Sequence, residues 1–94
     1  MNAEESNKYD VVLEDKFQEE LQDCLDYISY VLFSPQAANI LKNKSYELID
    51  SLQFFPRLFQ EYNDTCYRRI VVKKYSIFYL IDEENKVVKV KHFK

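Results

Sequence analysis

The fold of this chain is decided by residues 67–94, which read YRRIVVKKYSIFYLIDEENKVVKVKHFK. Runs of β-branched and aromatic residues alternate here with short polar breaks, the pattern of successive antiparallel strands. The break at Lys73-Lys74 is short, and the break from Asp82 to Lys86 suits a hairpin loop. The pattern predicts three strands, at Tyr67–Val72, Tyr75–Ile81 and Val87–Phe93.

The middle strand is apolar on both of its faces. Alternation places four residues on one face and two on the other: Tyr75, Ile77, Tyr79 and Ile81, against Phe78 and Leu80. A strand buried on both faces is usually an inner strand of its sheet. We therefore expect residues 75–81 to lie between two other strands.

Charge is strongly segregated along the sequence. Residues 67–94 hold eight basic and three acidic residues, hence a net charge of +5, whereas residues 1–66 hold five basic and thirteen acidic residues, hence −8. These opposite charges predict an acidic helical part and a basic sheet. Solvation explains any single charge, but basic groups gathered on one sheet also attract polyanions.

Length and composition restrict the classes of protein to which this chain can belong. The 94 residues predict a single domain, 1–94, with residues 1–8 frayed. No apolar run reaches the roughly 20 residues of a membrane span, and the acidic start resembles no targeting segment, so a cytoplasmic protein without a membrane partner is expected. The chain has no glycine, which excludes the glycine-rich phosphate loop and the dinucleotide fingerprint.

Cysteine and histidine usage argues against a metal site. Cys24 and Cys66 lie far apart in the sequence, and His92 is the only histidine. A structural zinc site needs more ligands at closer spacing, so neither a metal nor a cofactor is expected. In a cytoplasmic chain the two thiols are expected to be reduced.

Two helices are predicted before the three strands. Tyr9–Leu13 is a short strand candidate, and Asp15 with Gln18 forms a candidate capping box. Apolar residues then recur at helical spacing up to about Phe33: Phe17, Leu21, Cys24, Leu25, Ile28, Val31 and Leu32. Ser34-Pro35 suits the start of a second helix, to about Leu52. Its apolar stripe is Ala37, Ala38, Leu41, Leu48, Ile49 and Leu52.

The joint between the helices is short, so they are expected to form an antiparallel hairpin. Residues 56–66 are predicted to be an irregular connection in which Phe55 and Phe59 enter the core. The element order is β-α-α-β-β-β. The prediction is a two-layer α+β domain in which the helical hairpin packs on a small, mainly antiparallel sheet.

This order and several local phrases resemble the RelE/ParE superfamily, the toxins of type II toxin–antitoxin modules. The likeness covers roughly Tyr9 to Lys94. It is carried by Ser34 to Ala38, Ile49-Asp50-Ser51-Leu52 with Phe55-Pro56, Tyr67 to Val72, and Tyr75 to Val88. The resemblance implies a toxin that arrests growth, contributes to plasmid stabilisation and is neutralised in a hetero-oligomer by a cognate antitoxin.

The family implies two targets on one fold. RelE- and YoeB-like members cut messenger RNA, usually on the ribosome, whereas ParE-like members inhibit DNA gyrase and cut no RNA. A fold alone does not choose between them. A third alternative is a non-catalytic interaction module that keeps the fold without toxicity. The chain is thus either a metal-independent endoribonuclease or no enzyme.

Arg68 and Arg69 are the candidates to hold a phosphate, because guanidinium grips phosphate with two parallel hydrogen bonds. Neighbours on a strand point to opposite faces, so only one of them faces a cleft. Arg69 resembles the arginine that follows Ser-Arg in YoeB-like nucleases and is the catalytic candidate. The alternative role for either arginine is a salt bridge to the acidic helices or to the antitoxin.

His92 is the candidate acid or base, because its unperturbed pKa of about 6.5 suits proton transfer. The alternative is a surface or packing residue near a chain end. Lys89 and Lys91 share one face of the last strand and, with Arg68, Lys73 and Lys74, are candidates to bind a nucleic acid or another target. The alternative for the lysines is solvation and protection of a strand edge.

Two departures from the nucleases favour either a gyrase-directed toxin or a natural variant with weak activity. The nucleases carry an arginine near the position of Ser76. They also place a catalytic Tyr or His after the last strand, and many relatives have a Gly-Arg-Arg-Asp-like tail there. A chain that stops at Lys94 is expected to lack that part.

Overall fold

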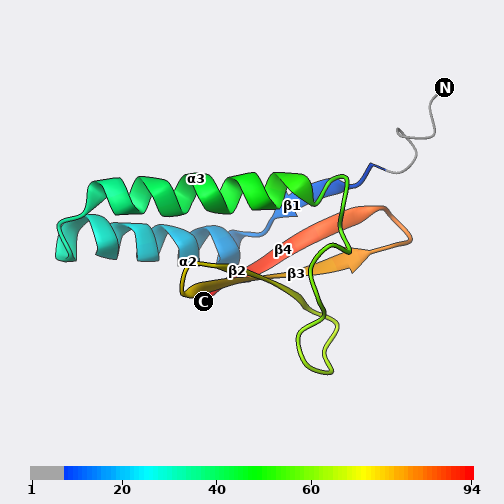
Figure 1. Cartoon of the computed structure of the whole chain (residues 1–94). Coiled ribbons are helices and arrows are strands. Elements are labelled where there is room, and N and C mark those ends of the chain that lie inside the picture. Colours follow the sequence, from blue (N-terminus) through cyan, green and yellow to red (C-terminus); the bar gives the residue numbers. More distant parts are fainter. Residues whose placement is uncertain (1–7) are drawn as a thin grey trace.

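A computed structural model describes residues 8–94, so most of the stretch expected to be frayed lies outside the described residues. The elements are β1 (Asp10–Leu13), α2 (Asp15–Asp26), the π-helical turn η1 (Tyr27–Val31), α3 (Pro35–Ser51), β2 (Arg68–Val72), β3 (Tyr75–Asp82) and β4 (Val87–Phe93). The helices form an antiparallel hairpin on one face of the sheet (Figure 1). The predicted α+β class and the predicted element order are both confirmed.

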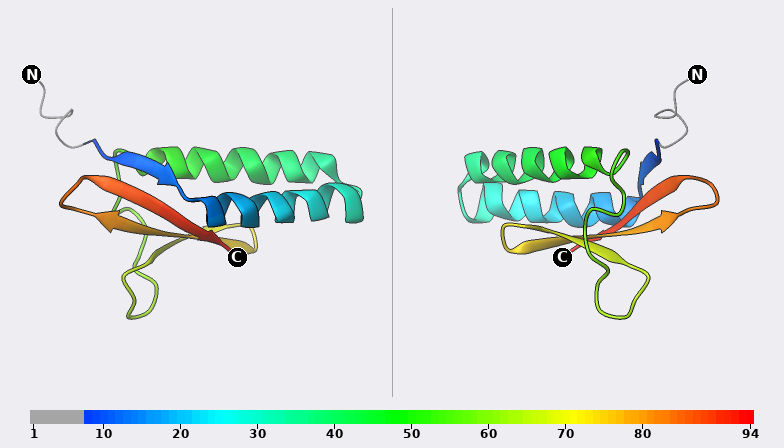
Figure 2. Two further views of the ribbon diagram at one scale, coloured as in Figure 1. Left: turned by 180° about the vertical axis from the view of Figure 1, so that it is seen from behind. Right: turned by 45° about the vertical axis from the view of Figure 1, so that its right-hand side comes forward.

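The four strands form one sheet in the order β1-β4-β3-β2. β1 runs parallel to β4, while the β4–β3 and β3–β2 pairs are antiparallel. The middle strand β3 is therefore an inner strand, as predicted. Two views from other sides show the helices covering the same face of the sheet throughout (Figure 2). The face turned away from the helices is called the outer face below.

Side chains from both layers fill the core between the helices and the sheet. Large, almost fully buried members come from β3, β4, β2 and both helices: Tyr79, Ile77, Val88, Val90, Ile70, Phe17, Ile49 and Leu52. The edge-to-face pair of Phe17 and Phe93, with ring centroids 6.3 Å apart, joins α2 to the end of β4. Both ends of the sheet's last strand are thus fixed by packing.

A β-bulge interrupts the regular alternation of β4. Tyr79 pairs with Val90 and Phe78 pairs with His92, so Lys91 is an extra residue in the ladder. Before the bulge the even-numbered residues Val88 and Val90 face the core, and after it the odd-numbered Phe93 does. Because β4 gains a residue at the bulge, its alternation shifts by one position, and His92 lies on the outer face beside Phe78.

The predicted capping box of α2 is wrong, whereas Ser34 is the N-cap residue of α3 as predicted. α2 begins at Asp15, but Glu14 occupies the N-cap position and makes no capping hydrogen bond. Glu14 still belongs to the strand ladder, because its N–H donates to the Val90 carbonyl at 3.1 Å. Ser34 makes no capping bond either, although Pro35 stands in the first turn of α3 as predicted.

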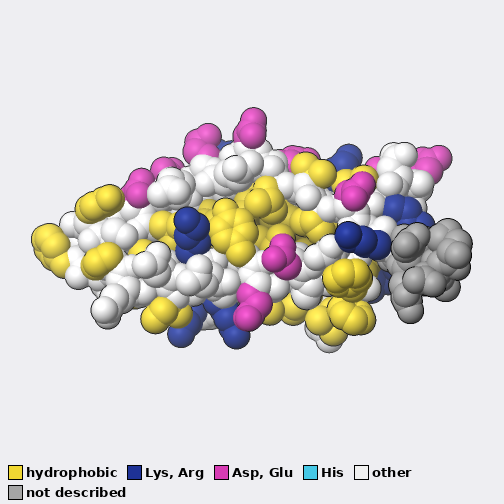
Figure 3. Space-filling model, turned by 90° about the horizontal axis from the view of Figure 1, so that it is seen from above, with side chains coloured by type: hydrophobic (Ala, Val, Ile, Leu, Met, Phe, Trp, Pro, Cys, Tyr) yellow, Lys and Arg dark blue, Asp and Glu magenta, His cyan; other side chains and the backbone are white. Residues whose placement is uncertain are grey.

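The end of the helical hairpin projects beyond the sheet (Figure 1). Several apolar side chains at this end are exposed. Val31 and Leu32 belong to the predicted apolar stripe of the first helix, yet they are 56% and 52% exposed. This end of the stripe is exposed because the helix widens into η1 and the sheet does not reach this far (Figure 1). Separate hydrophobic patches are visible at this end of the space-filling view (Figure 3). Phe33, with φ of 53°, turns the chain into α3.

The connection after α3 is anchored differently from the prediction. Phe59 packs against the core as expected, but Phe55 is 61% exposed, so the prediction for Phe55 is wrong. The buried Pro56 lies against the core instead, and its carbonyl accepts a 2.6 Å hydrogen bond from the Tyr79 hydroxyl. Burial raises the pKa of Tyr79 to about 12, so this hydroxyl keeps its proton at neutral pH.

Candidate functional site

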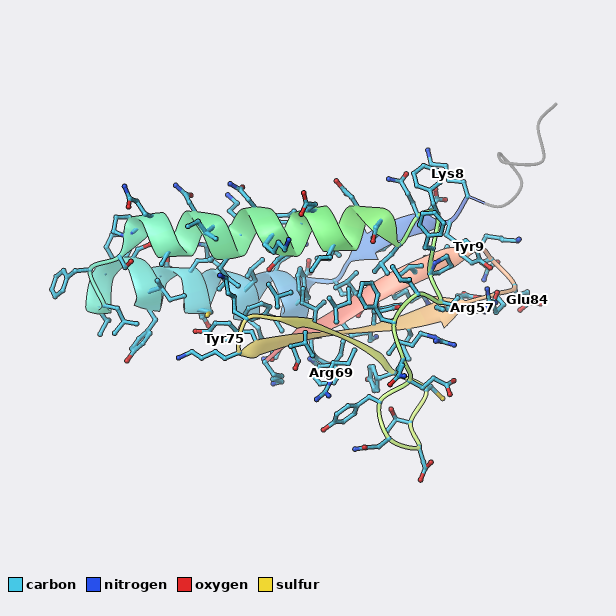
Figure 4. The ribbon with its side chains drawn as sticks, in the orientation of Figure 1. Lys8, Tyr9, Arg57, Arg69, Tyr75 and Glu84 are labelled. Atoms are coloured by element: carbon cyan, nitrogen blue, oxygen red, sulfur yellow. The ribbon has the colours of Figure 1, made fainter. Side chains whose placement is uncertain are left out.

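The sheet register brings Arg69, Phe78 and His92 into one row across three strands. Arg69 of β2 pairs with Phe78 of β3, which pairs with His92 of β4. Directly paired residues of an antiparallel sheet point to the same face. Arg69 points away from the helices, so this row lies on the outer face (Figure 4). The two candidate catalytic residues, Arg69 and His92, therefore share one surface.

Arg68 and Arg69 have different surroundings. Arg68 shares a face with the buried Tyr79, its Nη1 donates to the Phe59 carbonyl at 2.8 Å, and its Nη2 lies 3.9 Å from Glu61. Arg69 is exposed, and its guanidinium carbon lies 4.9 Å from the centroid of the Tyr62 ring. Arg68 thus ties the connection 56–66 to the sheet, and only Arg69 is available on the outer face.

Two acidic side chains neutralise most of the cations at the end of β4. Lys91 Nζ lies 2.9 Å from Glu14 Oε1, and this hydrogen bond raises the pKa of Lys91. Glu20 of α2 accepts from Lys94 Nζ at 2.6 Å and lies 3.3 Å from His92 Nδ1. Acidic residues of the N-terminal part of the sequence therefore form ion pairs with basic residues of the C-terminal part.

The other basic candidates are dispersed. Lys89 pairs with Leu80 of β3 across the outer face. Lys73 and Lys74 form the turn between β2 and β3, and Lys73 has a φ of 58°. They border an apolar groove of about 500 Å³ between that turn and the helical hairpin, lined by Ile28, Leu32, Ser34, Ala37, Leu41 and Tyr75. The candidate binding residues thus do not form one basic surface.

Sequence reasoning missed an aromatic cluster on the outer face. The ring centroids of Tyr62 and Phe78 lie 5.0 Å apart, those of Tyr67 and Phe78 lie 6.3 Å apart, and those of Tyr67 and His92 lie 6.2 Å apart. With Thr65 and Lys94, these residues line a pocket of about 260 Å³. We call it the aromatic pocket. The alternation of β3 marks Phe78 as outward-facing, but Tyr62 comes from the irregular connection and carries no such signal.

Within residues 8–94, no three His, Cys, Asp or Glu side chains come together in a way that could hold a metal ion. Cys24 and Cys66 are free thiols. None of the helices in the described range has the length and apolar character needed to cross a membrane.

Comparisons with known proteins agree on one group. A family model described as the ParE toxin of type II toxin–antitoxin systems matches residues 11–93. The solved chromosomal ParDE toxin–antitoxin system from P. aeruginosa is similar, with a TM-score of 0.76 and 14% identity over 94% of this chain and 96% of that chain. The RelBE2 toxin–antitoxin complex from Mycobacterium tuberculosis gives a TM-score of 0.66 and 15% identity over 93% and 96%. No curated protein matches.

Proposed function

This chain belongs to the ParE toxin family of type II toxin–antitoxin systems, and we propose that it arrests growth by binding DNA gyrase through the outer face of its sheet. The proposal also includes neutralisation by a cognate antitoxin in a hetero-oligomer. The solved relatives are toxin–antitoxin complexes, which supports a protein partner of that kind. In this proposal the chain is a binding protein and performs no chemistry on RNA.

The observation that carries the proposal is the scarcity of unpaired cations around Arg69. RNA cleavage without a metal needs cations to stabilise the crowded phosphate, together with a base and an acid. Arg68 is directed to the Phe59 carbonyl, and Lys91 is paired with Glu14. The nucleases carry an arginine near the position of Ser76, whose strand neighbour is Val71. Arg69 and Lys89 are left on the outer face without an ion pair among the described residues, and two separated cations are too few for this chemistry.

One observation favours the ribonuclease as the second candidate. His92 lies in the aromatic pocket, and its Nδ1 contacts a carboxylate, as in many catalytic histidines. Its Nε2 then holds a lone pair that can accept a proton. A ribonuclease of this kind depends on His92 and Arg69 together, which separates the two candidates experimentally.

The test uses the purified chain in two assays. In the first, DNA gyrase supercoils relaxed plasmid in the presence of increasing toxin. In the second, a translation extract is incubated with toxin, and the length of the message is followed. We expect supercoiling to stop and the message to stay intact. Arg69→Glu is expected to relieve the inhibition of gyrase at least tenfold, because it reverses the charge on the outer face.

Lys44→Glu is the matched control, since Lys44 is a similarly exposed cation on α3 that pairs with Glu47. It is expected to inhibit gyrase as the wild-type chain does. Normal supercoiling with excess toxin would overturn the proposal. Cleaved message that becomes intact in both the Arg69→Glu and His92→Gln variants would establish the ribonuclease instead.

A further inference from the structure

The starting point is the Glu20 carboxylate, which holds three groups of the chain's last residues. Its Oε1 accepts the Phe93 backbone N–H at 3.0 Å and lies 3.3 Å from His92 Nδ1, and its Oε2 accepts from Lys94 Nζ at 2.6 Å. The Glu20 side chain is only 13% exposed. A carboxylate with this many donors is a fixed structural element.

Glu20 lies beside the C-terminal end of β4, on the side where the sheet has no neighbouring strand. β1 ends at Leu13, opposite Val90, and the chain then turns into α2. The remaining part of β4 therefore has no neighbouring strand on this side. Glu20 replaces that neighbour, because it accepts the Phe93 N–H that a strand would otherwise accept.

The contact between Glu20 and His92 Nδ1 sets the tautomer of the His92 ring. A carboxylate only accepts hydrogen bonds, so Nδ1 carries the proton that faces Glu20. In the neutral ring Nε2 then holds a lone pair. Among residues 8–94, no hydrogen bond to Nε2 is present. Because the His92 ring lines the aromatic pocket, it adds a ring-nitrogen acceptor to a lining that also includes the hydroxyl-bearing Tyr62, Thr65 and Tyr67.

The aromatic pocket suits one planar side chain. Tyr62, Tyr67 and Phe78 meet edge to face, and the volume of about 260 Å³ is sufficient for one aromatic ring. Arg69 lies over Tyr62 at the margin of the pocket and has no carboxylate partner within the described residues. A ligand for this pocket thus combines an aromatic ring that bears a donor with a neighbouring negative charge.

A peptide fits this combination better than a nucleic-acid strand. Nucleic-acid grooves follow the phosphate backbone with several cations. Here Lys94 and Lys91 are neutralised by Glu20 and Glu14. Lys89 also lies on the outer face, opposite Leu80, but Arg69 is the cation that contacts a wall of the pocket, the Tyr62 ring. One cation matches one acidic side chain next to the anchoring ring.

We propose that the aromatic pocket anchors a Tyr or Trp side chain of a protein partner, with an acidic residue beside it. The hydroxyl or ring N–H of that side chain donates to His92 Nε2, and the acidic residue pairs with Arg69. Glu20 is the positioning residue, because it sets the His92 tautomer. This inference rests on the proposed function in one respect, namely that a protein covers the outer face.

The binding test uses acetyl-Asp-Tyr-amide and acetyl-Asp-Phe-amide as probes, titrated into the 15N-labelled full chain. We expect the Tyr probe to shift the amide signals of Tyr67, Phe78 and His92, and the Phe probe to bind about five- to tenfold more weakly, since it lacks the donor. Equal binding of both probes, or no shift at millimolar concentrations, would overturn the proposal. Tighter binding of uridine 5′-monophosphate would identify a nucleotide site instead.

The positioning role is tested through the protonation of the His92 ring. Long-range 1H–15N spectra are expected to show the Nδ1–H tautomer in the wild-type chain and in Glu19→Gln, and a mixture of tautomers in Glu20→Ala. If Glu20→Ala fails to fold, His92→Gln keeps an acceptor and is expected to bind the Tyr probe better than His92→Phe does. A wild-type ring that carries its proton on Nε2 would contradict the inference. These tests involve no gyrase, so they can fail independently of the proposed function.

Discussion

The Tyr79 hydroxyl donates a 2.6 Å hydrogen bond to the Pro56 carbonyl, and this bond joins the inner strand β3 to the irregular connection after α3. Further anchors follow on the same connection, since Arg68 Nη1 donates to the Phe59 carbonyl and the Arg69 backbone N–H donates to the Gln60 carbonyl. Tyr62, which forms part of the aromatic pocket, lies on the same connection. The shape of the pocket thus depends on core residues that never touch a ligand.

Tyr79→Phe is expected to lower the free energy of unfolding by about 1–2 kcal/mol, because the buried Pro56 carbonyl loses its donor. Urea unfolding measures the change. Tyr30→Phe is the control, since Tyr30 is 74% exposed at the end of the helical hairpin, and its loss is expected to be negligible. Equal effects of the two changes would show that the Tyr79 anchor contributes nothing.

The two neighbouring arginines are expected to separate stability from function. Arg68→Met is expected to cost about 1.5–3 kcal/mol of unfolding free energy, because Arg68 donates to a partly buried carbonyl. Arg69→Met leaves stability nearly unchanged and is expected to reduce growth arrest on induction. Urea unfolding and growth curves of both variants measure this. A loss of stability in Arg69→Met larger than that in Arg68→Met would contradict the assignment.

Replacing Ser45 by alanine is expected to stabilise the fold. Its hydroxyl is fully buried on α3 and has no hydrogen-bond partner within the described residues. Ser45→Ala removes the unsatisfied group and raises helix propensity, so the free energy of unfolding is expected to rise by about 0.5–1.5 kcal/mol. Ser51→Ala is the control, because the Ser51 hydroxyl donates to the Leu48 carbonyl at 2.6 Å. A destabilised Ser45→Ala would mean that the Ser45 hydroxyl has an unrecognised partner.

Stability is expected to depend on acid pH through Glu20. Partial burial raises the pKa of Glu20, but hydrogen bonds from Lys94, Phe93 and His92 outweigh it, and the pKa lies below its ordinary value of 4.5. A carboxyl whose pKa is lowered by folding stabilises the fold fully above the unfolded pKa and loses that effect as the pH falls through the folded pKa.

Glu20→Gln is therefore expected to be less stable than the wild-type chain at pH 7, and the difference is expected to shrink below pH 4. Urea unfolding at a series of pH values measures both chains. Glu19→Gln, one residue away on the exposed side of α2, serves as the control. A difference that stays constant from pH 7 to pH 3 would show that the Glu20 charge plays no part.

The strands and helices could be predicted because their patterns are local. The three strands after residue 66 were placed within one residue of their observed bounds at every end, since alternation and turn residues lie within each segment. The parallel pairing of β1 with β4 was not predicted, because it joins segments more than 70 residues apart. Sequence periodicity carries no information about such a partner.

The candidate site was predicted only in part, for the same reason. That Arg68 and Arg69 face opposite sides follows from strand alternation, and the structure agrees. The neutralising partners Glu14 and Glu20 were not identified from the sequence, because their contacts with β4 arise only after the chain folds back. Val31 and Leu32 continue the helical stripe beyond the reach of the sheet, so the helical period alone misplaced them.

The bulge at Lys91 has a consequence for aligning related sequences. An alignment that assumes unbroken alternation along β4 pairs His92 with inward-facing positions of relatives and Phe93 with outward-facing ones. Relatives that lack the extra residue need a one-position gap there before their last residues are compared. Without that gap, a histidine on the surface is matched to core positions, and any inference about inherited chemistry at this position is drawn from the wrong column.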